Sequence, residues 1–394
     1  TVYRGGGSKL MIYLDHAATS WPKPEKCIFE IERCMRCYCG NPGRSTHRMS
    51  MEAARKIYDC RVAIAEMFGC DAPEHVIFTY NTTYALNIAI KALAAPNTHI
   101  IISNFEHNAV FRPVAALSEM HCEYSIFDAR GTREQILQSF SRAVRHNTKL
   151  AVITHASNIC SHSLPIAEIG QYCNSHGILL IVDAAQSAGI LPINLKNDHI
   201  DILCAPGHKG LYGPQGTGFL IIGSRAEDIM ASGNTIIEGG SGYQSAEIHM
   251  PFSLPERYEA GTLATPAIAG LLESIKWIRQ IGRETIEYQE RMVIQKMREM
   301  LANTPGVQLY EPDICYQNYN SSKKETSTVH SGSIVLFNLN GIDPSVVGEA
   351  LNSRGIYVRS GLHCAPLAHQ TIGSGTVGAI RVSIGYQNRT NDAD

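Results

Sequence analysis

The sequence predicts an α/β fold with a mostly parallel central sheet, and three observations lead to this prediction. Short β-branched apolar segments alternate with amphipathic segments between residues 74 and 223. Near-continuous apolar strands of this kind are typical of parallel sheets that helices cover on both faces. Polar side chains directly follow several of these strands, and such folds bind their ligands at the carboxyl ends of the strands.

The large domain is expected to span residues 24–265, and a smaller α+β domain to comprise 11–23 and 266–394. Strands of the large domain are predicted at 75–79, 99–103, 122–127, 150–154, 178–183, 200–204 and 218–222, and helices at 83–93, 133–145 and 165–176. A long helix at 266–302 should link the domains; the small one has predicted strands at 332–339 and 378–384 and a helix at 344–353. Residues 315–330 are expected to form a polar surface loop, and residues 1–10 to be an added leader before a natural start at Met11.

The composition is that of an ordinary soluble globular protein. The 394 residues are 44% hydrophobic and 18% charged, with a formal net charge of −2, which favours neither a nucleic acid nor a membrane as partner. No apolar run approaches the roughly 20 residues that span a membrane, and no secretory signal opens the chain. We therefore expect a cytoplasmic location.

Twelve cysteines at irregular spacings indicate free thiols and no disulfide framework. Cys27, Cys34, Cys37 and Cys39 are close together in the sequence, and a metal site is one interpretation of this cluster. No matching second set of ligands follows, so we favour small buried thiols on a helix and its exit loop. No metal is expected.

Asp183, at the end of one predicted strand, and Lys209, in a later glycine-rich loop, are the most informative pair. A lysine amine can hold the aldehyde of pyridoxal 5′-phosphate as a Schiff base. A carboxylate can keep the pyridine nitrogen protonated, so that the ring accepts electrons from a substrate carbanion. Taken singly, a solvated lysine and a helix-capping aspartate are the simpler interpretations. The pair, with the contacts described next, favours a pyridoxal phosphate site.

The phosphate is expected at the N-terminus of a helix that begins near Thr82 and Thr83, where free amides and two hydroxyls form an anion cradle. Plain N-capping explains one of these hydroxyls. His208, beside the lysine, is expected to reach the phosphate as well.

Three residues are expected around the pyridine ring. His107 is expected to lie flat on the ring and assist proton transfer, although a capping or core histidine is the simpler interpretation without the lysine. Asn158 is expected near the ring hydroxyl, and Gln186 near the phenolic oxygen.

These residues, with Tyr13-Leu-Asp15-His-Ala-Ala-Thr-Ser and Gly40-Asn-Pro-Gly43-Arg-Ser-Thr-His47, resemble the class V aminotransferase-fold pyridoxal phosphate enzymes. Among them the chain is most similar to the group II cysteine desulfurases and selenocysteine lyases, from about residue 12 to residue 387. The resemblance implies fold type I and a homodimer with active sites at the subunit interface. Thr262 would then contact the phosphate in the partner's site.

The resemblance also implies the chemistry of the segment around Cys364, within Val358-Arg359-Ser-Gly-Leu-His363-Cys364-Ala-Pro. Lys209 would remove the α-proton of L-cysteine, and the Cys364 thiolate would take the sulfur as a persulfide, leaving L-alanine. His363 and Arg359 are expected to favour the thiolate electrostatically. Arg381 is expected to bind the substrate carboxylate by two points, with Arg359 and Asn158 also in contact with substrate.

The short segment between Arg359 and Arg381 favours the group II type, whose cysteine is held close to the cofactor, although the glycine-rich segment 373–378 leaves the mobility of the cysteine loop open. We therefore predict a cysteine desulfurase that passes sulfur to a protein or small-molecule acceptor. One alternative is a selenocysteine lyase acting on L-selenocysteine. Another is a non-catalytic scaffold of the same fold.

Overall fold

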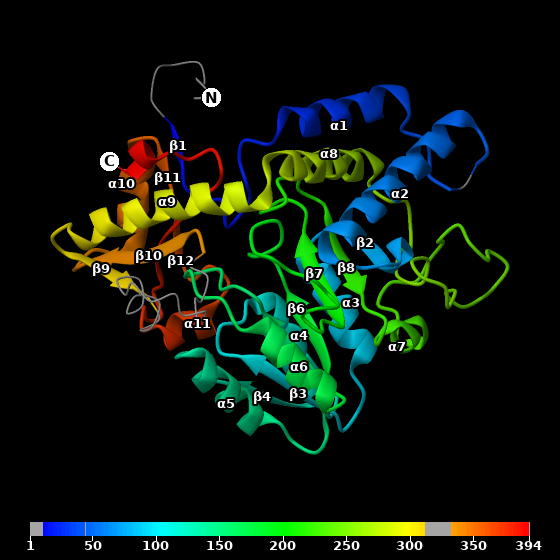
Figure 1. Ribbon diagram of the computed structural model, residues 1–394, viewed down its shortest axis with the longest axis horizontal. Coiled ribbons are helices and arrows are strands. Elements are labelled where there is room, and N and C mark those ends of the chain that lie inside the picture. Colours follow the sequence, from blue (N-terminus) through cyan, green and yellow to red (C-terminus); the bar gives the residue numbers. More distant parts are fainter. Residues whose placement is uncertain (1–10, 44, 312–331, 394) are drawn as a thin grey trace.

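The computed structural model describes residues 11–43, 45–311 and 332–393 (Figure 1). The expected leader at 1–10 and the whole of the polar loop expected at 315–330 lie outside the described residues. Within the described ranges, no helix is both long and apolar enough to cross a membrane.

A seven-stranded sheet forms the centre of the large unit, in the order β2-β8-β7-β6-β5-β3-β4. Only β8 is antiparallel to its neighbours, so the prediction of a mostly parallel sheet is confirmed. The strands are β2 (Val76–Thr79), β3 (His99–Ser103), β4 (Glu123–Phe127), β5 (Thr148–Thr154), β6 (Leu179–Asp183), β7 (Ile202–Pro206) and β8 (Gly218–Ile222).

Helices cover both faces of this sheet, which explains why its central strands are apolar throughout. On β3, Ile100 and Ile102 face the helices α3 and α4, whereas Ile101 faces α2, α5, α6 and α8. Burying both faces removes the alternation of apolar and polar residues seen in strands with one wet face. The helices are α2 (Arg48–Phe68), α3 (Thr82–Leu93), α4 (Asn108–Ser118), α5 (Arg133–Ala143), α6 (Ile166–Ser175), α7 (Glu227–Ser232) and α8 (Thr265–Ile281).

The single long helix expected at 266–302 is wrong, because Gly282 divides it into α8 and α9 (Arg283–Ala302). Gly282 has φ 89° and ψ 126°, a conformation outside the helical region that glycine adopts with little strain. In Figure 1, α9 runs from the large unit toward the smaller sheet.

The smaller sheet has the strand order β12-β13-β10-β9. A separate parallel pair joins β1, near the start of the chain, to β11. The elements of this region are β1 (Ile12–Tyr13), β9 (Val307–Tyr310), β10 (Ile334–Leu339), α10 (Pro344–Ser353), β11 (Ile356–Tyr357), β12 (Arg359–Gly361), α11 (Pro366–Thr371) and β13 (Ala379–Ser383). The domain boundaries at residues 24 and 266 stay a prediction.

The cysteine cluster lies on α1 (Glu25–Cys37), which packs along α8, and just beyond its end. Cys27 and Cys34 are fully buried as expected, but Cys37 and Cys39 are exposed, so the expectation of buried thiols is wrong for these two. The buried stripe continues from Cys34 to Tyr38, and Cys37 points about 100° away from Tyr38 around the helix axis. Within the described residues, no group of three possible metal ligands is present.

Candidate active site

The predicted cofactor-binding residues between Thr82 and Lys209 lie on segments that follow strands ending at one edge of the large sheet. β3, β5, β6 and β7 are parallel, and β2 runs the same way because β8 lies antiparallel between it and β7. Asp183 is the last residue of β6, and Lys209 lies three residues beyond the end of β7. The two residues therefore lie at the strand ends where the sequence predicts the site, and their roles stay a prediction.

Asp183 and Lys209 are electrostatically coupled. Asp183 is 2% exposed, and burial raises the pKa of its carboxyl to about 6, while the charge of Lys209 acts against this rise. Burial, and then the charge of Arg381, lower the pKa of Lys209 to about 8. A larger fraction of Lys209 is consequently a free amine near neutral pH than for a lysine in water, and a free amine is the form that condenses with an aldehyde.

Thr82 and His208, two of the residues predicted to bind phosphate, each present a buried polar atom without a hydrogen-bond partner among the described residues. These atoms are Thr82 Oγ1 and His208 Nδ1. Asn81 caps α3, its Oδ1 accepting from the Tyr84 amide at 3.1 Å, so the cap leaves the Thr82 hydroxyl free. Thr83 is exposed on the same turn.

Thr262 lies exposed in a hollow that Tyr80 and Tyr84 also line. Its contact with a phosphate in a partner subunit stays a prediction.

His107 caps the N-terminus of α4, where its Nδ1 accepts a hydrogen bond from the Ala109 amide at 3.0 Å. Nδ1 is thus unprotonated and Nε2 carries the hydrogen. Burial, and then the charge of Lys209, lower the pKa of His107 to about 4, so the ring is neutral at pH 7. Gln186 donates from Nε2 to the Ala17 carbonyl at 3.1 Å and lines the same cavity as Lys209.

Arg381 lies on β13, and its guanidinium makes one hydrogen bond to the large unit and one to the segment that follows β1. Its Nη1 donates to the Asn158 carbonyl at 3.0 Å, and its Nη2 to Asp15 Oδ1 at 2.8 Å. The side chain is 3% exposed, and its Nε has no partner among the described residues, as is also true of Asn158 Oδ1. A buried guanidinium with a free N–H suits a carboxylate ligand.

Cys364 lies beside His107 because its carbonyl accepts a hydrogen bond from the Asn108 amide at 2.8 Å. His363 and Cys364 both have positive φ, 51° and 56°. Left-handed backbone costs about 1–3 kcal/mol per non-glycine residue and persists only where neighbours hold it. Asn158 Nδ2, which donates to the His363 carbonyl at 2.8 Å, is one such neighbour.

The expected electrostatic help from His363 is wrong, because burial lowers the pKa of that imidazole to about 2 and leaves it neutral at pH 7. Arg359, on β12, is exposed and is therefore the cation of this segment that remains available to a thiolate. Cys364 itself is exposed to solvent.

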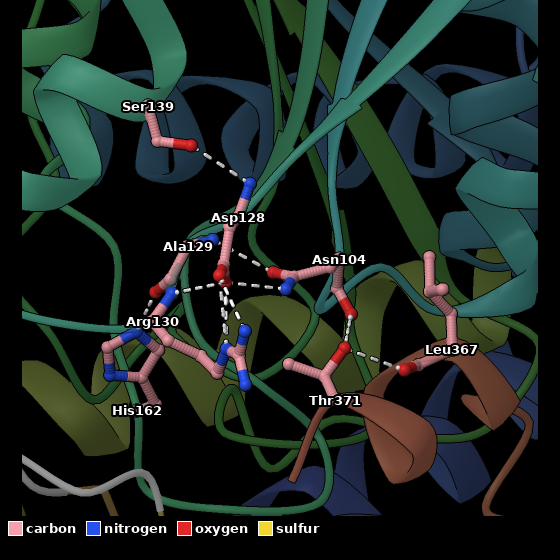
Figure 2. Close-up of polar contacts among 8 residues, drawn as sticks. All are labelled: Asn104, Asp128, Ala129, Arg130, Ser139, His162, Leu367 and Thr371. Carbon is pink, nitrogen blue, oxygen red and sulfur yellow. Dashed lines mark hydrogen bonds and ion pairs between the residues drawn. The ribbon is translucent and has the colours of Figure 1, made fainter.

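α11, which follows Cys364, is fixed to the large unit through Asn104 (Figure 2). Thr371 Oγ1 donates to the Asn104 carbonyl at 3.2 Å. The Asn104 side chain is held in turn, donating from Nδ2 to Asp128 Oδ1 at 2.8 Å and accepting from the Ala129 amide at 2.9 Å. The segment from Cys364 to Thr371 is thus hydrogen-bonded to the large unit at both ends, through the Cys364 carbonyl and the Thr371 hydroxyl. The glycine-rich stretch 373–378 lies beyond it.

Sequence reasoning missed Asp15, Asn104 and Asn108 as parts of this site. Asp15 stood in a quoted motif, but its partner Arg381 is 366 residues away. Asn108 acts through its backbone amide, which carries no side-chain signal.

The residues present fit pyridoxal phosphate on the chemistry of their unpartnered atoms. Lys209 offers an amine for the aldehyde, and Asp183 a buried carboxylate for a protonated ring nitrogen. Thr82 Oγ1 and His208 Nδ1 offer polar partners for a phosphate. Buried polar atoms are normally hydrogen-bonded in folded proteins, so these unpartnered atoms indicate that a polar ligand binds here.

The sheet order, the strand-end lysine and the small appended sheet define the α/β fold of type I pyridoxal phosphate enzymes, as predicted. The chain belongs to the aminotransferase class-V family, whose model matches residues 12–394. It is 30% identical over 379 residues to a probable cysteine desulfurase of Pyrococcus abyssi, covering 94% of this chain and 89% of that one. A probable cysteine desulfurase of Methanothermobacter thermautotrophicus is 29% identical over 389 residues, with 97% and 92% covered.

Among solved structures, the apo cysteine desulfurase of Thermococcus onnurineus NA1 matches with a TM-score of 0.86 and 28% sequence identity. The match covers 97% of this chain and 92% of that one. Both the family and the fold class inferred from the sequence are therefore confirmed.

Proposed function

We propose that this chain is a pyridoxal phosphate-dependent cysteine desulfurase that converts L-cysteine to L-alanine and carries the sulfur on Cys364. The observation that carries the proposal is the meeting of three groups in one site: the Lys209 amine, the buried Asp183 carboxylate and the buried Arg381 guanidinium. The Cys364 backbone is hydrogen-bonded beside this site. The relatives named above supply the reaction type.

Each residue has a separate task in this proposal. Bound pyridoxal phosphate supplies an electron sink for the carbon next to the substrate carboxylate. Arg381 binds that carboxylate, and Lys209 Nζ takes the proton from the adjacent carbon, for which a pKa of about 8 is well placed. Cys364 Sγ, as a thiolate, bonds to the substrate sulfur while the carbon–sulfur bond breaks, which leaves a persulfide on the enzyme and alanine as product.

The exposure of Cys364 favours transfer to an acceptor after this step. A buried persulfide would need a channel, whereas an exposed one can meet the thiolate of a protein or of a small molecule directly. We also propose that the chain works as a homodimer, in which Thr262 of one subunit serves the phosphate of the other.

Product analysis tests the proposal. Purified protein with pyridoxal phosphate is incubated with L-cysteine or L-selenocysteine, each with and without a reductant, and alanine, sulfide and selenide are measured. We expect alanine from L-cysteine and its loss in Cys364→Ala, while Cys37→Ala, which removes another exposed thiol, stays active. Protein that carries the cofactor on Lys209 and forms no alanine from L-cysteine refutes the proposal.

A further inference from the structure

Two buried histidines and a serine form a hydrogen-bonded chain directly behind Cys364. His363 Nδ1 lies 3.1 Å from His369 Nε2, and His369 Nδ1 lies 2.6 Å from Ser374 Oγ. The three residues are 6%, 0% and 6% exposed, respectively. The two rings are nearly parallel, with 16° between their planes.

The Arg359 carbonyl and the Ser374 hydroxyl, at the two ends of this hydrogen-bonded series, determine which ring nitrogens of the histidines carry hydrogen. His363 Nε2 lies 3.3 Å from the Arg359 carbonyl, which only accepts, so Nε2 carries the hydrogen and Nδ1 is the acceptor. His369 must then donate from Nε2 to His363, which leaves its own Nδ1 to accept from the Ser374 hydroxyl. At 2.6 Å this nitrogen is the nearer of two acceptors for that hydroxyl, the other being the His369 carbonyl at 3.2 Å. Hydrogen bonds therefore point in one direction, from Ser374 through both rings to Arg359.

Both histidines are held neutral, as this arrangement requires. Burial is the main cause, and the charge of Arg381 adds to it, lowering the pKa of His363 to about 2 and that of His369 to about 4. A proton on His363 Nδ1 would face the N–H of His369 and break the chain.

The hydrogen bonds through His363 and His369 connect Arg359 to Ser374, the two ends of the segment that carries the nucleophile Cys364. One end of the imidazole of His363 holds the Arg359 carbonyl, and the next residue along the backbone is Cys364. The left-handed backbone of His363 and Cys364 needs such support, which Asn158 and Asn108 supply from the large unit only through two carbonyls.

We propose that His369 is a positioning residue for sulfur transfer: through His363 it holds the turn from Arg359 to Cys364 in the conformation that presents the thiol to the substrate. This inference rests on the proposed desulfurase function. Since His369 touches neither Cys364 nor the site of the cofactor in any hydrogen bond described, it acts through His363 and the backbone.

Two variants of His369 separate this role from simple core filling. His369→Phe keeps a planar ring but removes both hydrogen bonds, whereas His369→Gln keeps an N–H donor for His363. His99→Phe is the matched control, because His99 is also 0% exposed and both of its ring nitrogens are also hydrogen-bonded, in this case to Thr148 Oγ1 at 2.8 Å and Ser125 Oγ at 2.9 Å.

The first readout is turnover of two substrates. We expect His369→Phe to lower kcat for L-cysteine by about 10- to 100-fold with little change in KM, because a displacement of about 1 Å can cost that much. Turnover of L-selenocysteine, measured with a reductant, should stay within about threefold of the wild type, since the weaker carbon–selenium bond breaks without attack by Cys364. Selenium then departs as the neutral element, which the reductant converts to selenide, and the electron pair of the bond stays on the carbon that becomes the methyl group of alanine. His369→Gln should recover most of the L-cysteine activity, and His99→Phe should leave the ratio of the two activities unchanged.

The second readout needs no activity. Amide hydrogen exchange across residues 359–374 should be at least about tenfold faster in His369→Phe and in Ser374→Ala than in the wild type, and close to wild type in His369→Gln. Equal losses for both substrates, no loss for either, or unchanged exchange in His369→Phe overturns the inference. If the wild type makes no alanine, the proposed function is refuted instead. The exchange measurement then still decides whether the hydrogen bonds of His369 hold the turn from Arg359 to Cys364.

Discussion

Replacing Arg381 by lysine should selectively weaken recognition of the substrate carboxylate. The wild-type guanidinium uses one N–H on the Asn158 carbonyl at 3.0 Å and another on Asp15 at 2.8 Å, and its Nε–H has no partner among the described residues. Lysine keeps the positive charge opposite Asp15, so the fold should survive. It cannot, however, hold Asp15, the carbonyl and a substrate carboxylate with the geometry of a planar fork.

The loss should amount to at least one charge-assisted hydrogen bond. Such a bond contributes about 1.5–3 kcal/mol, and at 1.36 kcal/mol per factor of ten this lowers kcat/KM for L-cysteine by about 10- to 150-fold. We expect most of the effect in KM, because the carboxylate is bound before and during the reaction.

Alanine formation over a range of L-cysteine concentrations measures this effect, and L-cysteine methyl ester provides the control substrate because it lacks the carboxylate. Arg354→Lys is the matched control variant, since Arg354 is an exposed arginine at the C-terminal end of α10 and outside the site. The reasoning is refuted if Arg381→Lys lowers turnover of the ester as much as that of cysteine, or changes kcat/KM for cysteine by less than about threefold.

Three further predictions concern the cofactor, pH and the helix break. Lys209→Ala should abolish both the yellow absorbance of the cofactor-loaded protein and alanine formation, measured by spectroscopy and product analysis; a variant that keeps the absorbance contradicts the assignment of Lys209. Burial raises the pKa of Glu290 to about 8 from 4.5, so the folded state holds an extra proton and stability falls as the pH rises between these values. From pH 6 to pH 9 the free energy of unfolding should therefore decrease by about 3 kcal/mol. Denaturant titrations at several pH values measure this decrease, and the Glu290→Gln variant should lack it. Gly282→Ala should lower the free energy of unfolding by about 1–3 kcal/mol, because alanine is strained at φ 89°. Gly348→Ala, inside α10, should not lower the free energy of unfolding, because its backbone is helical. Equal decreases in the two variants would argue against backbone strain at Gly282.

The sequence predicts those parts of the candidate site that depend on local pattern. Asp183 and Lys209 could be found because a buried strand is recognisable from its run of apolar residues, and the residue after it has a known place in the fold. The helix at Pro344–Ser353 was predicted to the residue, since Asp343 caps it and Pro344 suits its first turn.

Contacts between distant segments could not be read in this way. The Asp15–Arg381 pair depends on the segment after β1 meeting β13 in space, and Asn104 supports the cysteine segment through Thr371 of α11, 267 residues later. The break at Gly282 was missed because an isolated glycine is compatible with a helical pattern, and only its backbone angles reveal the interruption.

The contacts of residues 12–20 have a consequence for folding during translation. β1 pairs with β11, the Asp15 backbone bridges to Ser383, and Ser20 binds the His208 carbonyl next to Lys209. The partners of this segment on β11 and β13 lie more than 340 residues further along the chain, so they leave the ribosome much later. The active site therefore cannot be completed before β13 has emerged, and a nascent chain translated only as far as β10 should be unable to assemble it.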